Sequence, residues 1–188
     1  MEDIFYRILS QQWLWGVIIG ATLTYLLQRL QSLHQQKEKQ KIASMQVATL
    51  LRCWLFDCSN AVLDHQNWES SNGEMGRILG KIPALNIEQS LDQIVCLDTA
   101  EAKAVFEWIH ETKNAERTYV FMLDVDGEIA TDQLLIDCGA LFKSGLNIYN
   151  TLAPIVGWEA SPVSEDSIQR MASLGDRDRK TAERDEES

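Results

Sequence analysis

The sequence has few residues that interrupt helices, and they are unevenly placed. The first of its three prolines is Pro83, and no glycine occurs between Gly20 and Gly73. Proline removes a helical hydrogen bond and glycine loosens a helical backbone, so their absence favours long helices here. The alternation of apolar and polar residues that marks a β-strand is also missing over any useful length. These absences predict an all-α fold.

Clustered metal ligands are missing too. The four cysteines, Cys53, Cys58, Cys96 and Cys138, form no Cys-x-x-Cys pair, and the three histidines do not complete a cluster at ligand spacing. A zinc site needs such a cluster, and we therefore expect neither a metal nor another cofactor. All four cysteines lie in apolar surroundings with a helical pattern, which predicts buried, unpaired thiols of the kind found in reducing compartments.

Basic residues are in the minority. The chain has 17 Lys and Arg against 28 Asp and Glu, giving a net charge of −11. This balance argues against a nucleic-acid partner, because nucleic acids select basic surfaces. It also disfavours broad contact with anionic lipid, for which only the short stretch 29–41 has suitable charge.

Charge is absent altogether from Ile8 to Gln28, a run of 21 residues. A helix rises about 1.5 Å per residue, so this run approaches the roughly 30 Å of a bilayer's hydrocarbon core. It has neither the basic start nor the small-residue cleavage site of a secretory signal peptide. We interpret residues 1–28 as an N-terminal flank with a single transmembrane anchor, in preference to a signal peptide or a buried helix of a soluble protein.

Basic residues beside the run predict its orientation. Arg7 precedes the run, whereas Arg29, Lys37, Lys39 and Lys41 follow it. Because the positive side of a span stays inside the cell, we expect a single-pass protein of the cell membrane with its N-terminus outside and its C-terminal domain in the cytoplasm. The residues expected at the membrane interface are Trp13, Trp15, Tyr25 and Arg29.

Small residues recur on one side of the predicted span. Gly16, Gly20 and Thr24 are four residues apart and therefore share a helix face. Small residues at this spacing let two membrane helices approach closely. The pattern predicts a possible homodimer through this face.

The remaining chain divides by composition. Residues 29–41 are predicted to be a polar and basic helical stalk, and residues 42–157 a bundle of about four helices. Within the bundle, apolar residues three and four apart predict two long antiparallel helices, joined at Asp124–Gly127 and ended by Pro154. Their predicted packing residues are Val105, Trp108, Thr112, Ala115, Tyr119 and Met122 on the first helix, and Leu135, Cys138, Phe142, Gly145, Tyr149 and Leu152 on the second.

The other bundle segments are shorter. A helix is expected at Ile87–Leu97, and the glycine-containing segment Asn67–Asn86 is expected to be a long flexible connection. Residues 158–188 are expected to be mostly disordered apart from a short amphipathic helix at Ser164–Leu174. Ten of the last thirteen residues are charged, and such a tail cannot bury enough surface to offset its chain entropy.

Asp124 and Asp126 are the weak cation-site candidates. With Gly127 and Ile129 they resemble the middle of an EF-hand loop. That loop needs carboxylates at its ends, and the corresponding places hold Met122 and Gln133. We therefore expect the aspartates to end one helix and begin the next.

No group of polar residues has the spacing of a catalytic site. His110 shares a helix with Glu107 and Glu111, but such a stripe usually forms a solvated face, so we do not expect an enzyme. The leading hypothesis is a membrane-anchored cytoplasmic helical bundle that tethers, recruits or modulates another membrane or cytoplasmic protein. A structural membrane subunit is the alternative, because an anchor followed by a polar helix resembles the peripheral stalks of rotary ATPases. A sensor or enzyme using the Asp124–Gly127 turn is a further alternative.

Overall fold

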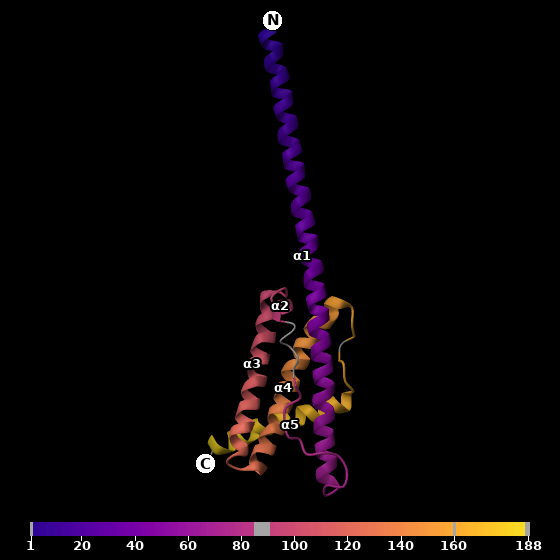
Figure 1. Ribbon diagram of the computed structural model, residues 1–188, viewed down its shortest axis with the longest axis vertical. Coiled ribbons are helices and arrows are strands. Elements are labelled where there is room, and N and C mark those ends of the chain that lie inside the picture. Colours follow the sequence, from indigo (N-terminus) through magenta and orange to yellow (C-terminus); the bar gives the residue numbers. More distant parts are fainter. Residues whose placement is uncertain (1, 85–90, 160, 187–188) are drawn as a thin grey trace. The chain divides into compact units, whose positions relative to one another are not determined.

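The computed structural model describes residues 2–84, 91–159 and 161–186; the side chains of residues 2–14, 91, 128 and 176–186 are outside the description. All regular secondary structure in these ranges is helical, which confirms the predicted all-α class (Figure 1). The helices are α1 (Glu2–Ser70), α2 (Leu91–Ile94), α3 (Thr99–Leu123), α4 (Gly127–Val156) and α5 (Glu165–Glu186). The chain forms two compact units, residues 1–40 and residues 41–188, which are described separately below.

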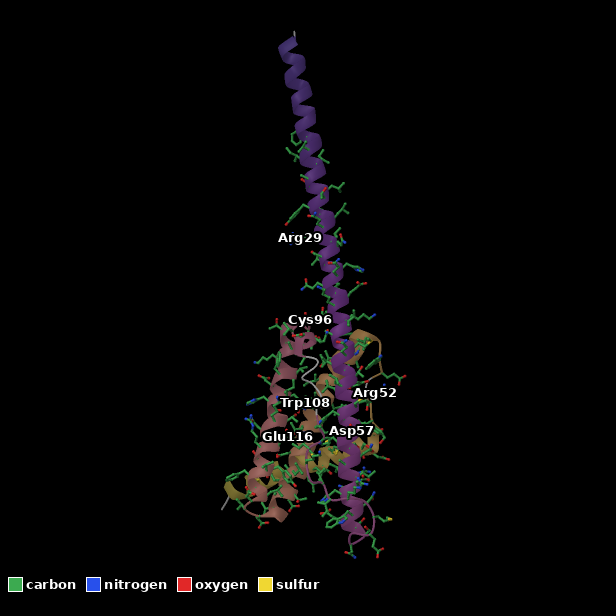
Figure 2. The ribbon with its side chains drawn as sticks, viewed as in Figure 1. Arg29, Arg52, Asp57, Cys96, Trp108 and Glu116 are labelled. Atoms are coloured by element: carbon green, nitrogen blue, oxygen red, sulfur yellow. The ribbon has the colours of Figure 1, made fainter. Side chains whose placement is uncertain are left out.

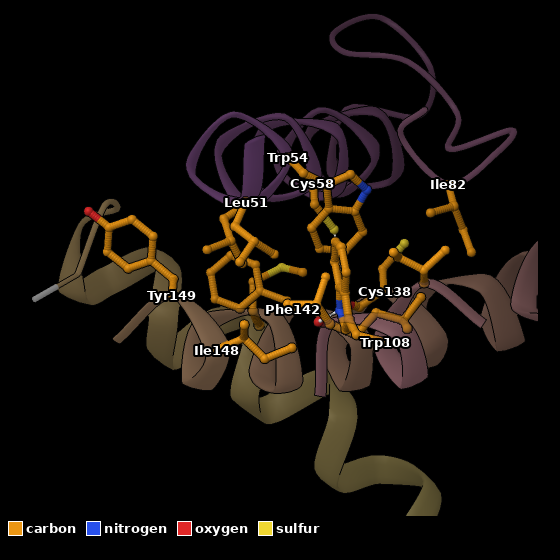
Figure 3. Packing of buried hydrophobic residues seen from close by; sticks show 14 of the residues in the cluster. Leu51, Trp54, Cys58, Ile82, Trp108, Cys138, Phe142, Ile148 and Tyr149 are labelled. Carbon is orange, nitrogen blue, oxygen red and sulfur yellow. Dashed lines mark hydrogen bonds between the residues drawn. The ribbon is translucent and has the colours of Figure 1, made fainter. Parts of the chain in front are cut away.

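The second unit is a helical bundle, as predicted. Helices α3 and α4 form an antiparallel hairpin, and α4 also packs against α5. The predicted seam residues are buried or partly buried, and residues 43–62 of α1 complete the core. At its centre the rings of Trp54 and Trp108 meet edge to face, with centroids 4.9 Å apart (Figure 3). The Trp108 indole N–H donates to the carbonyl of Leu141 at 2.9 Å, so this large buried side chain leaves no polar group unpaired.

Left-handed residues end two of the helices. Asn72, with φ of 53°, follows α1, and the Gly73 N–H bonds the carbonyl of Trp68 at 2.9 Å. Gly157, with φ of 77°, follows α4, and the next N–H bonds the carbonyl of Ala153 at 2.9 Å. Both ends are Schellman motifs, which satisfy the last carbonyls of a helix. Pro154 therefore lies inside α4 and does not stop it as predicted, although the helix ends only two residues later.

The segment 71–84, here called the strap, is tied to α1. The Arg77 N–H donates to the carbonyl of Asp64 at 3.2 Å, and the Trp54 indole N–H donates to the carbonyl of Pro83 at 2.9 Å. Leu79 and Ile82 of the strap are buried in the core. Residues 71–84 are thus a connection between helices, as predicted, and long-range hydrogen bonds and apolar burial hold them against α1.

The two remaining predicted segments differ in part from the structure. In the segment expected to form a helix at 87–97, α2 covers only Leu91–Ile94, and residues 85–90 lie outside the described part. The expected amphipathic helix is confirmed, with Met171 and Leu174 buried. Helix α5 nevertheless continues to Glu186, so the segment predicted to be mostly disordered is mostly helical. Gly139 of α4 lets the backbone of α5 approach closely, because a side chain there would overlap the backbone of Met171 and Gly175.

Within the residues that the structure describes, none of the helices has a stretch long and apolar enough to cross a membrane. The transmembrane part of the predicted fold is thus unsupported by the structure. Seven residues of the predicted span, Ile8–Leu14, have side chains outside the described part.

Candidate functional site

The glycine face predicted in the N-terminal unit is open. A methyl group added at Gly16 or Gly20 would meet no atom within 4 Å. The Thr24 hydroxyl donates to the carbonyl of Gly20 at 2.8 Å, and the Thr22 hydroxyl donates to that of Ile18 at 2.7 Å. Both hydroxyls are thereby satisfied within the helix, which suits them to apolar surroundings.

The predicted interface residues are exposed where they are described. Trp15 and Tyr25 have 64% and 61% of their surface exposed, and Trp13 lies outside the described side chains. Arg29 is also exposed (Figure 2). Trp15 and Tyr25 belong to a long apolar surface on α1. Its large exposed members are Trp15, Val17, Ile18, Ile19, Leu23, Tyr25, Leu26, Leu27, Leu30 and Leu33. A continuous apolar surface of this kind marks a site of contact with lipid or protein.

The two aspartates of the cation-site candidate lie at helix ends, as the preferred interpretation predicts. Asp124 ends α3, and a carboxylate oxygen of Asp126 accepts the backbone N–H of Ile129 at 3.2 Å in the first turn of α4. Among the described residues, no group of three or more His, Cys, Asp or Glu side chains could hold a metal ion. The arrangement supports capping roles for the turn.

Exposed apolar side chains gather around the same turn. Val120, Phe121, Leu123, Val125 and Ile129, here called the hairpin tip, are between 44% and 75% exposed. The sequence carried a signal for this surface, because Phe121 and Val125 depart from the three-four spacing of the buried seam. This surface was nevertheless not predicted. A dense group of exposed aromatic and aliphatic residues is typical of a protein-binding surface.

A cavity of about 550 Å³ lies between α1 and the strap. Asp57 and Asp64 of α1 and Arg77 and Lys81 of the strap are among its lining residues. Beside the cavity, Nδ1 of the buried His65 ring accepts a hydrogen bond from the Leu79 N–H at a distance of 3.2 Å. This bond requires the proton of a neutral ring to be on Nε2, which faces a Glu69 carboxylate oxygen at 3.4 Å without good hydrogen-bond geometry.

This environment gives His65 a structural role. Its ring stacks on Trp68 with centroids 6.0 Å apart, and its Nδ1 is already used to hold the strap. His110 instead contacts Asn114 on the surface of α3 at 3.0 Å, while Glu107 pairs with Lys103 at 3.5 Å. The structure therefore does not assemble the histidines and carboxylates that the sequence offered for catalysis.

Only two of the cysteines are buried, so the prediction was wrong for Cys53 and Cys96, which are exposed. Cys58 of α1 and Cys138 of α4 lie in the core (Figure 3). A hydrogen bond with Cys138, together with burial, raises the pKa of the Cys58 thiol well above its ordinary value. The thiol therefore stays protonated and packs as a small apolar group.

No protein-family model, characterised protein or solved structure matches this chain. The surfaces just described are therefore the features of the molecule that point to a function.

Proposed function

We propose that the protein is attached to a membrane through the N-terminal part of α1 and that its helical bundle binds another protein there. The observation that carries the proposal is the apolar surface of residues 15–33, whose large side chains are about half to two thirds exposed. Apolar area left in water costs about 25 cal/mol per Å², which a bilayer or a partner protein would remove.

The bundle supports the second half of the proposal. Its core is complete without residues 1–40, because α1 contributes buried residues to it only from Ala43 onward. Its hairpin tip then remains as an apolar surface that the core does not use. Asp124 and Asp126 lie within this surface, and no Lys or Arg occurs between Arg117 and Lys143. Such an acidic setting favours a protein partner over anionic lipid.

Flotation with phosphatidylcholine vesicles tests the attachment. The full chain should float with the vesicles, and a chain lacking residues 1–29 should stay at the bottom of the gradient while keeping its helical circular dichroism. The matched control carries Phe121→Ser with Val125→Ser; it removes exposed apolar area from the bundle and should float like the unchanged protein. A full chain that does not float, or a truncated chain that does, would contradict the proposal.

The basic residues after Gln28 support a definite orientation, with the N-terminus outside and the bundle in the cytoplasm. In intact cells, a membrane-impermeant thiol reagent should label an Asp3→Cys variant and should not label a Ser188→Cys variant. Both variants need Cys53→Ser and Cys96→Ser, because these two native thiols are exposed. Labelling of the Ser188→Cys variant alone would show that the bundle lies outside the cell and would contradict the proposed orientation.

Crosslinking in intact membranes followed by mass spectrometry tests the protein contact. We expect a neighbouring protein whose crosslinks are lost with Phe121→Ser and Val125→Ser but kept with a substitution of an exposed polar residue, such as Lys113→Ser. Unchanged crosslinks in the first variant would show that the hairpin tip does not bind the neighbour.

A further inference from the structure

One line of exposed apolar residues on the N-terminal unit has the spacing of a coiled-coil seam. Ile19, Leu23, Leu26, Leu30 and Leu33 follow one another at intervals of four, three, four and three residues. Each is between 49% and 63% exposed. Alternation of three and four keeps side chains on one narrow stripe of a helix, where they insert between the side chains of a facing helix.

Lipid does not account for the whole line. Leu30 and Leu33 come after Arg29, and the residues around them are polar: Gln31, Ser32, His34, Gln35 and Gln36. These neighbours belong in water, so the two leucines form an apolar stripe on an otherwise solvated helix. A stripe of this width matches the seam between two helices, not the wider face that packs on a globular core.

We propose that residues 19–37 of two copies of this chain pair along this line as a parallel, in-register two-stranded coiled coil. A second copy offers an identical seam, and attachment of both N-terminal segments to one membrane aligns the two helices in direction and height. This alignment rests on the proposed membrane attachment. Pairing also gives residues 29–40, a polar part of the 69-residue helix α1, a packing partner, and packing is the source of most helical stability in proteins.

The next position of the line supports pairing in a fixed register. Four residues after Leu33 is Lys37, which is exposed. A charged residue at one seam position lowers coiled-coil stability but restricts register and the number of strands. The line is also distinct from the Gly16–Gly20–Thr24 face, whose centre lies roughly 100° away around the helix at about 100° per residue.

Crosslinking of single cysteines reads the seam directly. In membranes holding the full chain with Cys53→Ser and Cys96→Ser, a short bismaleimide should give crosslinked dimers from the Leu26→Cys, Leu30→Cys, Leu33→Cys and Lys37→Cys variants. The Gln31→Cys and Gln35→Cys variants lie off the line and should lose the dimer. Equal crosslinking at all six positions, its absence at all six, or a product with the mass of a different protein would overturn the proposal.

A second measurement separates pairing from attachment. Leu30→Gln with Leu33→Gln should abolish the crosslinked dimer of the Lys37→Cys variant, yet this protein should still float with vesicles because residues 8–28 are unchanged. Retention of the dimer would overturn the coiled coil and leave the membrane proposal standing. If the full chain does not float but still crosslinks only at the positions of the line, the result would contradict membrane attachment and support the coiled-coil seam.

Discussion

Two parts of helix α1 are similarly apolar but differ in what covers them. Between Ala43 and Val62 one face is fully buried in the bundle core, while the opposite face keeps exposed residues such as Met45 and Phe56. Between Trp15 and Leu33 every described side chain is exposed, apolar residues included. Apolar composition therefore did not decide burial in this helix. The deciding factor is whether the chain itself supplies a packing partner.

This difference separates stability from attachment. Substitutions in the covered part and its partners should lower the free energy of unfolding of the bundle. Substitutions in the uncovered part should leave that free energy unchanged and alter binding to lipid or protein. The predictions below test this separation, from the largest expected effect to the smallest.

The largest effect is expected from Trp108→Ala. Trp108 is 1% exposed, packs edge to face on Trp54 of α1 and donates to the carbonyl of Leu141. Removing a buried indole costs about 3–5 kcal/mol of unfolding free energy through lost burial and the cavity left behind. Urea unfolding followed by circular dichroism measures this loss. The matched variant Trp15→Ala, in the uncovered part, should leave the unfolding midpoint of the bundle unchanged; equal losses would remove the distinction.

The next largest effect is expected in the strap, which is hydrogen-bonded to the carbonyl of Asp64 in α1. Gly76 has φ of 79°, and a methyl group there would overlap the carbonyl oxygen of Asp64. The Gly76→Ala variant combines backbone strain of about 1–3 kcal/mol with this steric overlap, so the strap should detach locally. Hydrogen exchange should then rise at the Arg77 and Leu79 amides, which bond to α1.

Gly80→Ala is the control for the strap, because its added methyl group would meet nothing within 4 Å. Its amide exchange should match that of the unchanged protein. Equal protection in the Gly76→Ala variant would show that the strap tolerates a side chain at this position.

The seams of α3 and α4 could be predicted because they depend on local periodicity. The buried or partly buried seam residues of each helix, such as Val105 in α3 and Phe142 in α4, follow one another at intervals of three and four along that helix. This spacing alone identifies the buried side of a helix that packs on a neighbour. The capping role of Asp126 was likewise local, since its carboxylate bonds an amide three residues later. The buried faces of α3 and α4 and the cap at Asp126 could thus be predicted from residue patterns within one or two helical turns.

The strap and the uncovered part of α1 could not be predicted in the same way. The path of the strap depends on bonds between distant residues, such as the Trp54 indole with the carbonyl of Pro83, and no local pattern encodes these. Two of the glycines that suggested flexibility, Gly73 and Gly76, instead supply positive φ values that the path requires. The described residues do not bury the apolar side chains of residues 15–33. Lipid and a partner protein therefore both remained possible contacts for these side chains.

A smaller effect is expected at the hairpin turn. The Asp126 carboxylate accepts the Ile129 amide in the first turn of α4, and loss of such a cap costs about 1 kcal/mol. Asp126→Ala should lower the unfolding free energy of the bundle by this amount, as measured in urea. Asp124→Ala is the matched change at the end of α3 and should have less effect. The reverse order would contradict the capping assignment.

The smallest effect is expected from Glu101→Gln in the first turn of α3, and it should depend on pH. Burial, and secondarily the charge of Asp98, raise the pKa of the Glu101 carboxyl, while a hydrogen bond from the Asp98 backbone N–H opposes this shift. A carboxyl whose pKa is higher folded than unfolded contributes stability below the unfolded pKa and loses it as pH rises through the folded pKa.

Glutamine mimics the protonated form, so Glu101→Gln should be slightly more stable than the unchanged protein at neutral pH. The difference should shrink as the pH is lowered through the raised pKa, because the native carboxyl then becomes neutral as well. Urea midpoints across this range measure the trend. Glu107→Gln, on the exposed face one to two turns later and paired with Lys103 at 3.5 Å, is the control and should show no such gain. A difference for Glu101→Gln that grows on acidification would contradict the assigned direction of the pKa shift.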